Sequence, residues 1–162
     1  MNPRKYGSSR LRSSYGSIVH GDVGGQGRVS PRRRNMQANR RRDTGPELAL
    51  RSLLHAKGFR YRTDLRLELS GAKVRPDIVF TRWKVAVFVD GCFWHQCPLH
   101  GTNPKTNSSY WGPKLERNRQ RDERNTAELV AHGWTVIRIW EHDEPLVGLE
   151  AVAAAIDEKR GR

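Results

Sequence analysis

The sequence predicts an α/β fold, with a small mixed β-sheet flanked by helices. Short apolar runs rich in β-branched residues lie at 77–80, 85–89 and 134–140, and amphipathic segments at 44–57 and 145–160 enclose them. Such runs are typical of buried strands, and apolar residues spaced three and four apart are typical of helices that cover a sheet. The predicted order of elements, α-β-β-β-α-β-α, places one core between helices and sheet.

The first helix is predicted to run over residues 44–57. Thr44 and Glu47 have the spacing of a capping box, in which a hydroxyl and a carboxylate accept hydrogen bonds from free amides of the first turn. Gly58 follows the last apolar position, and glycine commonly ends helices.

The centre of the fold is predicted to be a β-hairpin. Residues 77–80 and 85–89 form its strands and are joined by the short polar link 81–84. Before the hairpin, residues 59–62 alternate like a half-buried strand, and residues 65–73 are compatible with a short strand or a loop.

A loop that contains cysteine and histidine is expected from Gly91 to Tyr110. A long charged helix is then predicted to begin at Pro113 and to end near residues 132–133, because proline suits the first turn of a helix and glycine the position after the last.

Positive charge is concentrated at the N-terminus. The 162 residues include 30 Lys and Arg and 17 Asp and Glu, which gives a net charge of +13. Residues 1–42 hold ten Arg and one Lys against a single acid, a net charge of +10, whereas residues 43–162 carry +3. Residues 1–30 are predicted to be a disordered basic arm and residues 31–162 one compact domain. The excess predicts a polyanionic partner, although a solvated basic tail explains residues 32–42 equally well.

The composition argues against several classes of protein. No apolar run approaches the roughly 18 to 20 residues of a membrane span, and no secretory signal follows Met1. Two cysteines are too few for a disulfide scaffold, so a reducing, cytoplasmic compartment is expected.

Two carboxylates are predicted to meet at one edge of the sheet. Asp77 begins one strand of the hairpin and Asp90 follows the other, so antiparallel pairing brings them together. Paired carboxylates can hold a hard divalent cation, which can polarise a phosphoryl oxygen and lower the pKa of a bound water. The alternative is that both acids merely terminate strands.

The loop after Asp90 offers a set of ligands for zinc. Cys92, Cys97 and His100, together with the distant His142, supply the four ligands of a tetrahedral site that would fix the loop. Cysteines that only fill the core are the alternative. His95 is surplus to this set, and the spacing leaves open whether it is a general base or replaces His100 on the zinc.

Aromatic and charged side chains adjoin these residues. Phe93, Trp94, Tyr110 and Trp111 lie in polar segments, where large rings either wedge between base pairs or cover a small core. Further along, the predicted charged helix places three polar side chains on one face, namely Lys114, Asn118 and Arg121. Such side chains can contact bases and phosphates, although a charged helix face is often only solvated.

Taken together, these motifs resemble the very short patch repair (Vsr) endonucleases. The resemblance covers about residues 32–143 in order, and the segment Gly-Cys-Phe-Trp-His at 91–95 is highly specific. The matching segments are 34–36, 42–44 with Glu47, 75–80, 87–95, 104–107, 110–111, 118 with 121–122, and 133–141. The resemblance implies a restriction-endonuclease-like fold of the broader PD-(D/E)xK class.

The resemblance also implies an activity. The enzyme would nick one strand of double-stranded DNA beside a T:G mismatch left by deamination of 5-methylcytosine, which starts very short patch repair. Mg²⁺ would be the catalytic cofactor and Zn²⁺ the structural one. A monomeric, nucleoid-associated bacterial protein without a membrane partner is expected.

The family's catalytic residues fall on Asp77 as magnesium ligand, His95 as the base, Glu47 as the acid of the first helix and Asp122 as an acid beside His95. The family's intercalating aromatic residues fall on Phe93, Trp94 and Trp111, and its minor-groove wedge falls on Met36. The residues that recognise the mismatch fall on Lys114 and Asn118. The first zinc cysteine of the family falls on Cys92.

The chain departs from its better-known relatives at two places. Val89-Asp90 stands where they have Thr-His, so Val89 would give magnesium its backbone oxygen, and Asp90 either joins the metal ligands or has a role not assigned by the resemblance. The zinc ligands Cys97, His100 and His142 stand for a His, a Cys and a Cys, which keeps the ligand count and leaves His95 for catalysis.

Two rival functions fit the same residues. One is a non-catalytic, zinc-stabilised DNA-binding module, in which Asp77 and Asp90 are structural. The other is a nuclease of the same fold that cuts matched DNA on both strands.

Overall fold

The computed structural model describes residues 42–161 except 103 and 105–106, so the predicted arm at 1–30 and Met36 lie outside the described residues. The described helices are α2 (Gly45–Ala56), α3 (Ser108–Ala131) and α4 (Pro145–Arg160). The described strands are β1 (Arg62–Thr63), β2 (Leu67–Glu68), β3 (Lys73–Val74), β4 (Ile78–Phe80), β5 (Val85–Asp90) and β6 (Thr135–Trp140).

Four strands form the central sheet in the order β1-β4-β5-β6, and β2 and β3 form a separate hairpin. Strand β4 pairs antiparallel with β1 and β5, whereas β5 and β6 pair in parallel. The prediction of a small mixed sheet flanked by helices is therefore confirmed, as is the central hairpin.

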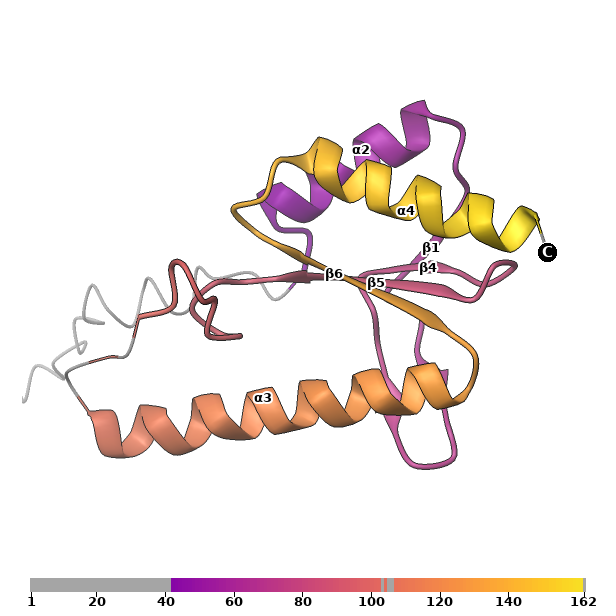
Figure 1. The fold of residues 1–162 in the computed structure, drawn as a ribbon. Coiled ribbons are helices and arrows are strands. Elements are labelled where there is room, and N and C mark those ends of the chain that lie inside the picture. The colour runs from indigo at the N-terminus through magenta and orange to yellow at the C-terminus, as the bar shows by residue number, and fades with distance from the viewer. Residues whose placement is uncertain (1–41, 103, 105–106, 162) are drawn as a thin grey trace, which may run out of the picture. The chain divides into compact units, whose positions relative to one another are not determined.

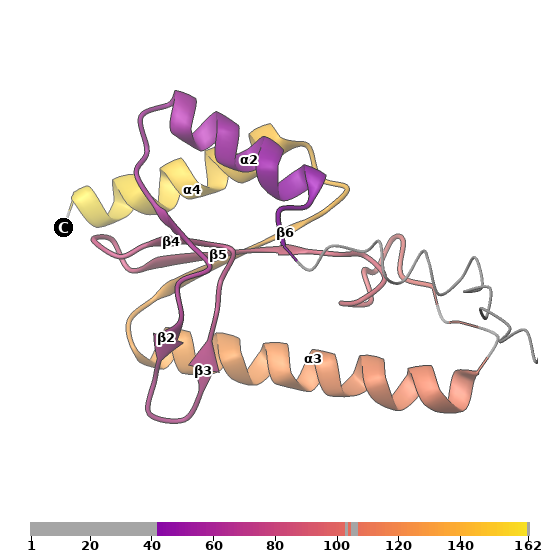
Figure 2. The ribbon, with the colours of Figure 1, turned by 180° about the vertical axis from the view of Figure 1, so that it is seen from behind.

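Helices cover both faces of this sheet. Figure 1 shows α2 and α4 on one face and α3 on the other, and Figure 2 shows the β2-β3 hairpin beside α3. Side chains along β5 point alternately to the two faces, so this strand contributes to the core on both sides of the sheet. Val85 and Val87 pack with α2 and α4, while Ala86 packs with Leu129 of α3. Among the described helices, none combines the length and apolar composition that a membrane span requires.

The predicted capping box at the start of α2 is wrong in its details. Thr44 is the N-cap, but its side chain makes no capping hydrogen bond. Glu47 instead accepts a hydrogen bond of 2.8 Å from the backbone N–H of Asp43, which has a left-handed φ of 56°. The second oxygen of Glu47 is bound by Arg51 at 3.1 Å, so this carboxylate is held by two partners.

The long helix begins one turn earlier than predicted, at Ser108, so Pro113 lies inside α3. The backbone N–H groups of Tyr110 and Trp111 both donate to the carbonyl of Asn107, which closes the extra turn. Proline removes one helical hydrogen bond. Ring contacts of Trp111 with the neighbouring loop stabilise the turn against this loss.

The strand predicted at 59–62 begins only at Arg62. Phe59 and Tyr61 instead place their rings edge-on against Phe80, with centroids 6.1 and 5.9 Å apart. Residues 65–73, which were compatible with strand or loop, enter the β2-β3 hairpin.

Truncation of the core should be costly where a side chain is fully enclosed. Leu54 is 0% exposed between α2 and the sheet, whereas Leu48 on the same helix is 43% exposed. Leu54→Ala should lower the free energy of unfolding by about 2–5 kcal/mol, and the matched control Leu48→Ala by less than about 1 kcal/mol. Urea denaturation measures both, and equal losses would contradict this packing.

Candidate functional site

The predicted catalytic acids do meet at one end of the central sheet. The backbone N–H of Asp77 donates to the carbonyl of Val87 at 3.1 Å, and the Asp77 carboxylate accepts a hydrogen bond of 2.8 Å from the N–H of Val89. Asp90 ends β5 on the same side, and Glu47 comes from the first turn of α2.

Asp77 lies in an environment that disfavours its charge. Burial and the charges of Glu47 and Asp90 raise the pKa of Asp77 to about 6, although the hydrogen bond from Val89 and the charge of His95 act in the opposite direction. Crowded carboxylates of this kind are relieved by a divalent cation, because its charge favours the ionised form.

His95 is held by an acid from α3. Its Nδ1 lies 2.6 Å from Oδ2 of Asp122 and 3.6 Å from Oδ1 of Asp90. Burial opposes the charge of Asp122, but the hydrogen bond and charge of His95, with the charge of Arg138, lower its pKa overall. An ionised carboxylate only accepts hydrogen bonds, so Nδ1 carries the proton and Nε2 is the basic nitrogen.

Asp90 is bound by a residue that the sequence pattern did not single out. Arg138 of β6 places Nε 2.6 Å and Nη2 2.8 Å from the two oxygens of Asp90, which is only 3% exposed. In the sequence Arg138 resembles an ordinary outward-facing residue of a strand. One signal in the sequence could have indicated this pair. Arg138 is a cation within an otherwise apolar strand, and another strand of the same sheet ends on an acid, Asp90.

The four predicted zinc ligands lie together. Cys92, Cys97, His100 and His142 place their ligand atoms within 4.8 Å of one another, and they form the one such Cys, His, Asp and Glu group found among the described residues. Sγ of Cys92 lies 3.0 Å from Nδ1 of His142, and Sγ of Cys97 lies 3.8 Å from it. Ligand atoms of tetrahedral zinc are about 3.3–3.8 Å apart, given the usual bond lengths.

Neighbouring polar groups orient this set. Nε2 of His142 lies 3.4 Å from Asp143, which leaves Nδ1 for the metal, and the backbone N–H of Cys92 donates to Glu141 at 2.7 Å. Burial and the nearby Cys97 raise the pKa of Cys92 to about 11, so a metal must displace a proton from this thiol. His95 is not in the group, because it faces Asp122 instead.

An aromatic cluster adjoins the loop that carries His95. The rings of Phe93 and Trp94 lie 5.0 Å apart, and Trp111 of α3 lies 5.3 and 5.9 Å from them. Lys114 places Nζ 5.2 Å from the Trp111 ring and 3.2 Å from the hydroxyl of Tyr110. The predicted DNA-contacting rings and Lys114 are therefore one cluster at the start of α3.

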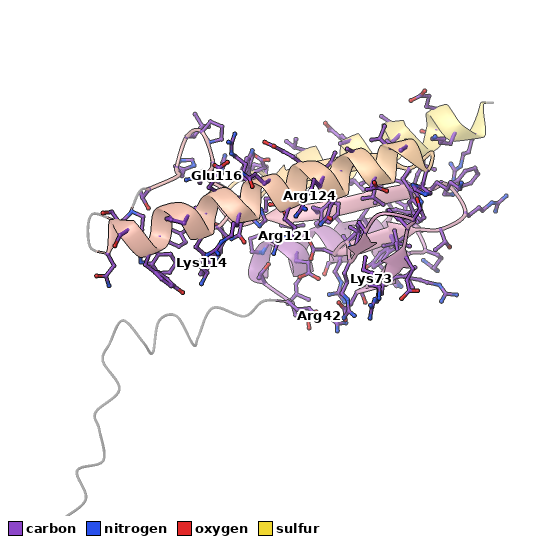
Figure 3. All side chains as sticks on the ribbon, turned by 90° about the horizontal axis from the view of Figure 1, so that it is seen from below. Arg42, Lys73, Lys114, Glu116, Arg121 and Arg124 are labelled. Atoms are coloured by element: carbon purple, nitrogen blue, oxygen red, sulfur yellow. The ribbon has the colours of Figure 1, made fainter. Side chains whose placement is uncertain are left out.

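Basic side chains accompany α3 away from this cluster. Figure 3, seen from below, labels Lys114, Arg121 and Arg124 along the helix together with the acid Glu116, and Lys73 and Arg42 beyond the helix. Such a face suits a phosphate backbone. Asn118, one turn after Lys114, is half-buried on the same helix.

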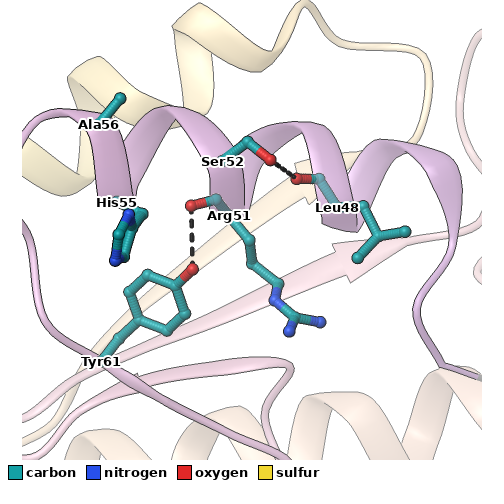
Figure 4. A pocket seen from close by; sticks show the side chains of 6 residues that line it. All are labelled: Leu48, Arg51, Ser52, His55, Ala56 and Tyr61. Carbon is teal, nitrogen blue, oxygen red and sulfur yellow. Dashed lines mark hydrogen bonds between the residues drawn. The ribbon is translucent and has the colours of Figure 1, made fainter.

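A hollow on α2 lies apart from these residues. Figure 4 shows the hydroxyl of Tyr61 donating to the carbonyl of Arg51 at 2.9 Å inside it. Its lining consists of Leu48, Arg51, Ser52, His55, Ala56 and Tyr61 and includes none of the predicted site residues.

Known proteins share these motifs. Residues 28–100 match the family described as DNA mismatch endonuclease Vsr. The type II nicking enzyme V.NaeI of Lentzea aerocolonigenes is 58% identical over 127 residues, which cover 78% of this chain and 75% of that enzyme. The chain belongs to the Vsr family.

Two other relatives extend the Vsr comparison. The type II nicking enzyme V.XorIIP of Xanthomonas oryzae pv. oryzae is 48% identical over 118 residues, or 70% of this chain and 83% of the relative. DNA mismatch endonuclease Vsr of Escherichia coli is 38% identical over 112 residues, or 68% and 69%. The predicted family is confirmed, and the protein is a DNA endonuclease rather than a non-catalytic binding module. Membership of this nuclease family implies use of a divalent metal, and the Cys/His group is a possible metal site.

The raised pKa of Asp77 predicts that its charge destabilises the metal-free protein. Because the folded-state pKa is about 6 against an ordinary 3.8, stability is lost as pH rises between these values and stays low above them. Asp77→Asn keeps an oxygen for Val89 and removes the charge. It should stabilise the protein at pH 8 by about 3 kcal/mol, and this gain should vanish below about pH 4.

The measurement is chemical denaturation across pH, without magnesium and without chelator so that any zinc stays bound. Asp157→Asn, at an exposed acid of α4, is the matched control and should show no such gain. Lower stability of Asp77→Asn at pH 8 would contradict the assignment.

Proposed function

We propose that the protein nicks one strand of double-stranded DNA beside a T:G mismatch left by deamination of 5-methylcytosine, and so starts very short patch repair. The observation that carries this proposal is the His95–Asp122 hydrogen bond at the sheet edge that holds Asp77, with the half-buried rings of Phe93 and Trp94 on the same loop as His95. The relatives support it, since one is named a DNA mismatch endonuclease and others are named nicking enzymes.

Magnesium fits the acidic end of the sheet. Asp77 is the primary ligand, and Val89 supplies its carbonyl, because the N–H and C=O of one strand residue leave the same edge and the N–H already meets Asp77. When bound, the ion neutralises charge on the scissile phosphate and lowers the pKa of water.

His95 is the general base in this proposal. Asp122 fixes Nδ1 as the protonated nitrogen, so Nε2 accepts a proton from the attacking water. Gly91 and Cys92 follow Asp90, so no lysine stands where the general nuclease pattern places one, and His95 takes over its role. Glu47, held by Arg51, orients the water.

Mismatch selection would come from the aromatic cluster and its helix. Unstacking a paired step costs about a few kcal/mol and a mismatched step costs less, so wedging Phe93, Trp94 and Trp111 favours the mismatch. Lys114 and Asn118 then test the exposed edges of the bases. Met36, the proposed minor-groove wedge, lies outside the described residues.

Zinc is proposed as a structural ion held by Cys92, Cys97, His100 and His142. It would tie the loop after β5 to the turn after β6, and the loop carries His95 and the wedge. The basic arm at 1–30 is proposed to add affinity through phosphates, and residues 31–162 to act as one monomeric nuclease domain.

Removal of the base should separate binding from cleavage. His95→Ala should lower the nicking rate of a T:G duplex by at least about 100-fold and leave the affinity for that duplex within about twofold, since the ring is needed only for proton transfer. His132→Ala, which removes a surface histidine bound to Ser70, is the matched control.

The assay uses mismatched and matched duplexes with either strand labelled, in magnesium. Full cleavage by His95→Ala would reject the mechanism. Cleavage of both strands of matched duplex by the unaltered protein would favour a restriction-type enzyme instead.

Metal analysis tests the structural site. The purified protein should contain one zinc per chain, and a strong chelator should lower its melting temperature by more than about 10 °C, with recovery when zinc is restored. Cys97→Ser should lose the zinc. A folded protein that never contains zinc, with an unchanged melting temperature in chelator, contradicts this role.

A further inference from the structure

Asp90 and Arg138 meet because of the register of two parallel strands. Arg138 of β6 pairs with Phe88 of β5, and Asp90 lies two residues further along β5, so all three side chains leave one face of the sheet. Phe88 packs against the cluster that contains Leu129, which identifies this as the α3 face.

The pair is closely held, and its acid, Asp90, is buried. Both oxygens of Asp90 face the guanidinium of Arg138, at 2.6 and 2.8 Å, in a two-pronged arrangement. The guanidinium also lies 5.2 Å from the ring of Phe88. Such a fork restricts direction as well as distance, and a lysine does not reproduce it.

The same guanidinium reaches the acid that holds His95. Nη2 lies 3.6 Å from Oδ2 of Asp122, which is the oxygen 2.6 Å from Nδ1 of His95, and Nη1 donates to the hydroxyl of Thr126 at 3.4 Å. The contacts therefore run from Asp90 of β5 through Arg138 of β6 to Asp122 of α3 and on to His95.

We propose that Arg138, anchored by Asp90, is a positioning residue that sets the orientation of Asp122 and thereby of His95. The inference rests on the proposed function, in which His95 is the base. His95 and Asp122 belong to a loop and a helix with separate attachments to the sheet. Arg138 joins Asp122 to β6, and its partner Asp90 also lies 3.6 Å from Nδ1 of His95. A displacement of about 1 Å at a reacting group costs on the order of 100-fold in rate.

The role of Asp90 follows from this arrangement. The sequence allowed it to be either a magnesium ligand or a residue of unassigned role. A cation placed on Asp90 would lie beside the positive charge of Arg138 and be repelled. Asp90 is accordingly the anchor of Arg138, and magnesium is left to Asp77 and Val89.

The test compares two conservative variants on a T:G duplex. Arg138→Lys keeps the charge and removes the fork, and Asp90→Asn keeps the shape and removes the charge. Each should lower kcat roughly 10- to 100-fold while KM and the Mg²⁺ concentration for half-maximal rate stay within about twofold. Arg160→Lys, at the exposed pair with Asp157, is the matched control with unchanged kcat.

A double variant guards against simple misfolding. The double variant Asp90→Asn with Arg138→Met leaves no unpaired charge at this buried pair. Because the two residues act as one unit, its kcat should be no lower than that of the less active of the two single variants. Circular dichroism and melting curves show whether each variant is folded.

Three outcomes separate the possibilities. Wild-type kcat in folded Arg138→Lys overturns the positioning role. A raised Mg²⁺ requirement confined to Asp90→Asn overturns it in favour of Asp90 as a ligand. If His95→Ala nicks the duplex at the unaltered rate, His95 is not the base and the positioning role falls with it, and only failure of the unaltered protein to nick the T:G duplex overturns the proposed function itself.

Discussion

Strands β5 and β6 run in parallel from Val85 opposite Thr135 to Asp90 opposite Trp140, and the candidate site depends on this pairing. Because parallel strands end at the same edge, the loop after β5 and the turn after β6 emerge side by side. His142 can therefore approach Cys92, 50 residues earlier in the chain, and Arg138 can approach Asp90, 48 residues earlier. A shift of one residue in this register would move Arg138 to the opposite face and break both contacts.

Three buried or half-buried carboxylates at this edge are treated differently by their surroundings. Glu47 and Asp90 each face an arginine, whereas Asp77 receives a neutral backbone N–H from Val89. No buried side-chain polar atom lacks a hydrogen-bond partner in the described part of the chain. The negative charge that remains to be balanced is thus that of Asp77, which agrees with its raised pKa and with a cation bound there.

Features that depend on residues close together in the sequence could be predicted from the sequence. The cysteine and histidine spacing from Cys92 to His100 predicted three members of the group that the structure brings together, and strand periodicity predicted the central hairpin and the last strand. The fourth member, His142, is brought close only by the pairing of β5 with β6. Arg138 was missed because its partner is brought near only by strand pairing, which the sequence does not display. The helix α3 was predicted to start at Pro113 because proline favours the first turn of a helix, which is a preference of the backbone alone. In the structure α3 already starts at Ser108, and the packing of Trp111 keeps this earlier turn helical.

One face of α3 carries in sequence Trp111 of the aromatic cluster, the buried Leu115, Asp122 beside His95 and the buried Leu129. These positions recur after four and seven residues, which keeps them on one stripe of a helix. Inserting or removing a single residue between Leu115 and Leu129 would turn one part of the stripe by about 100° relative to the other. The fold therefore fixes the number of residues between Leu115 and Leu129, whatever the exposed side chains of this helix contact.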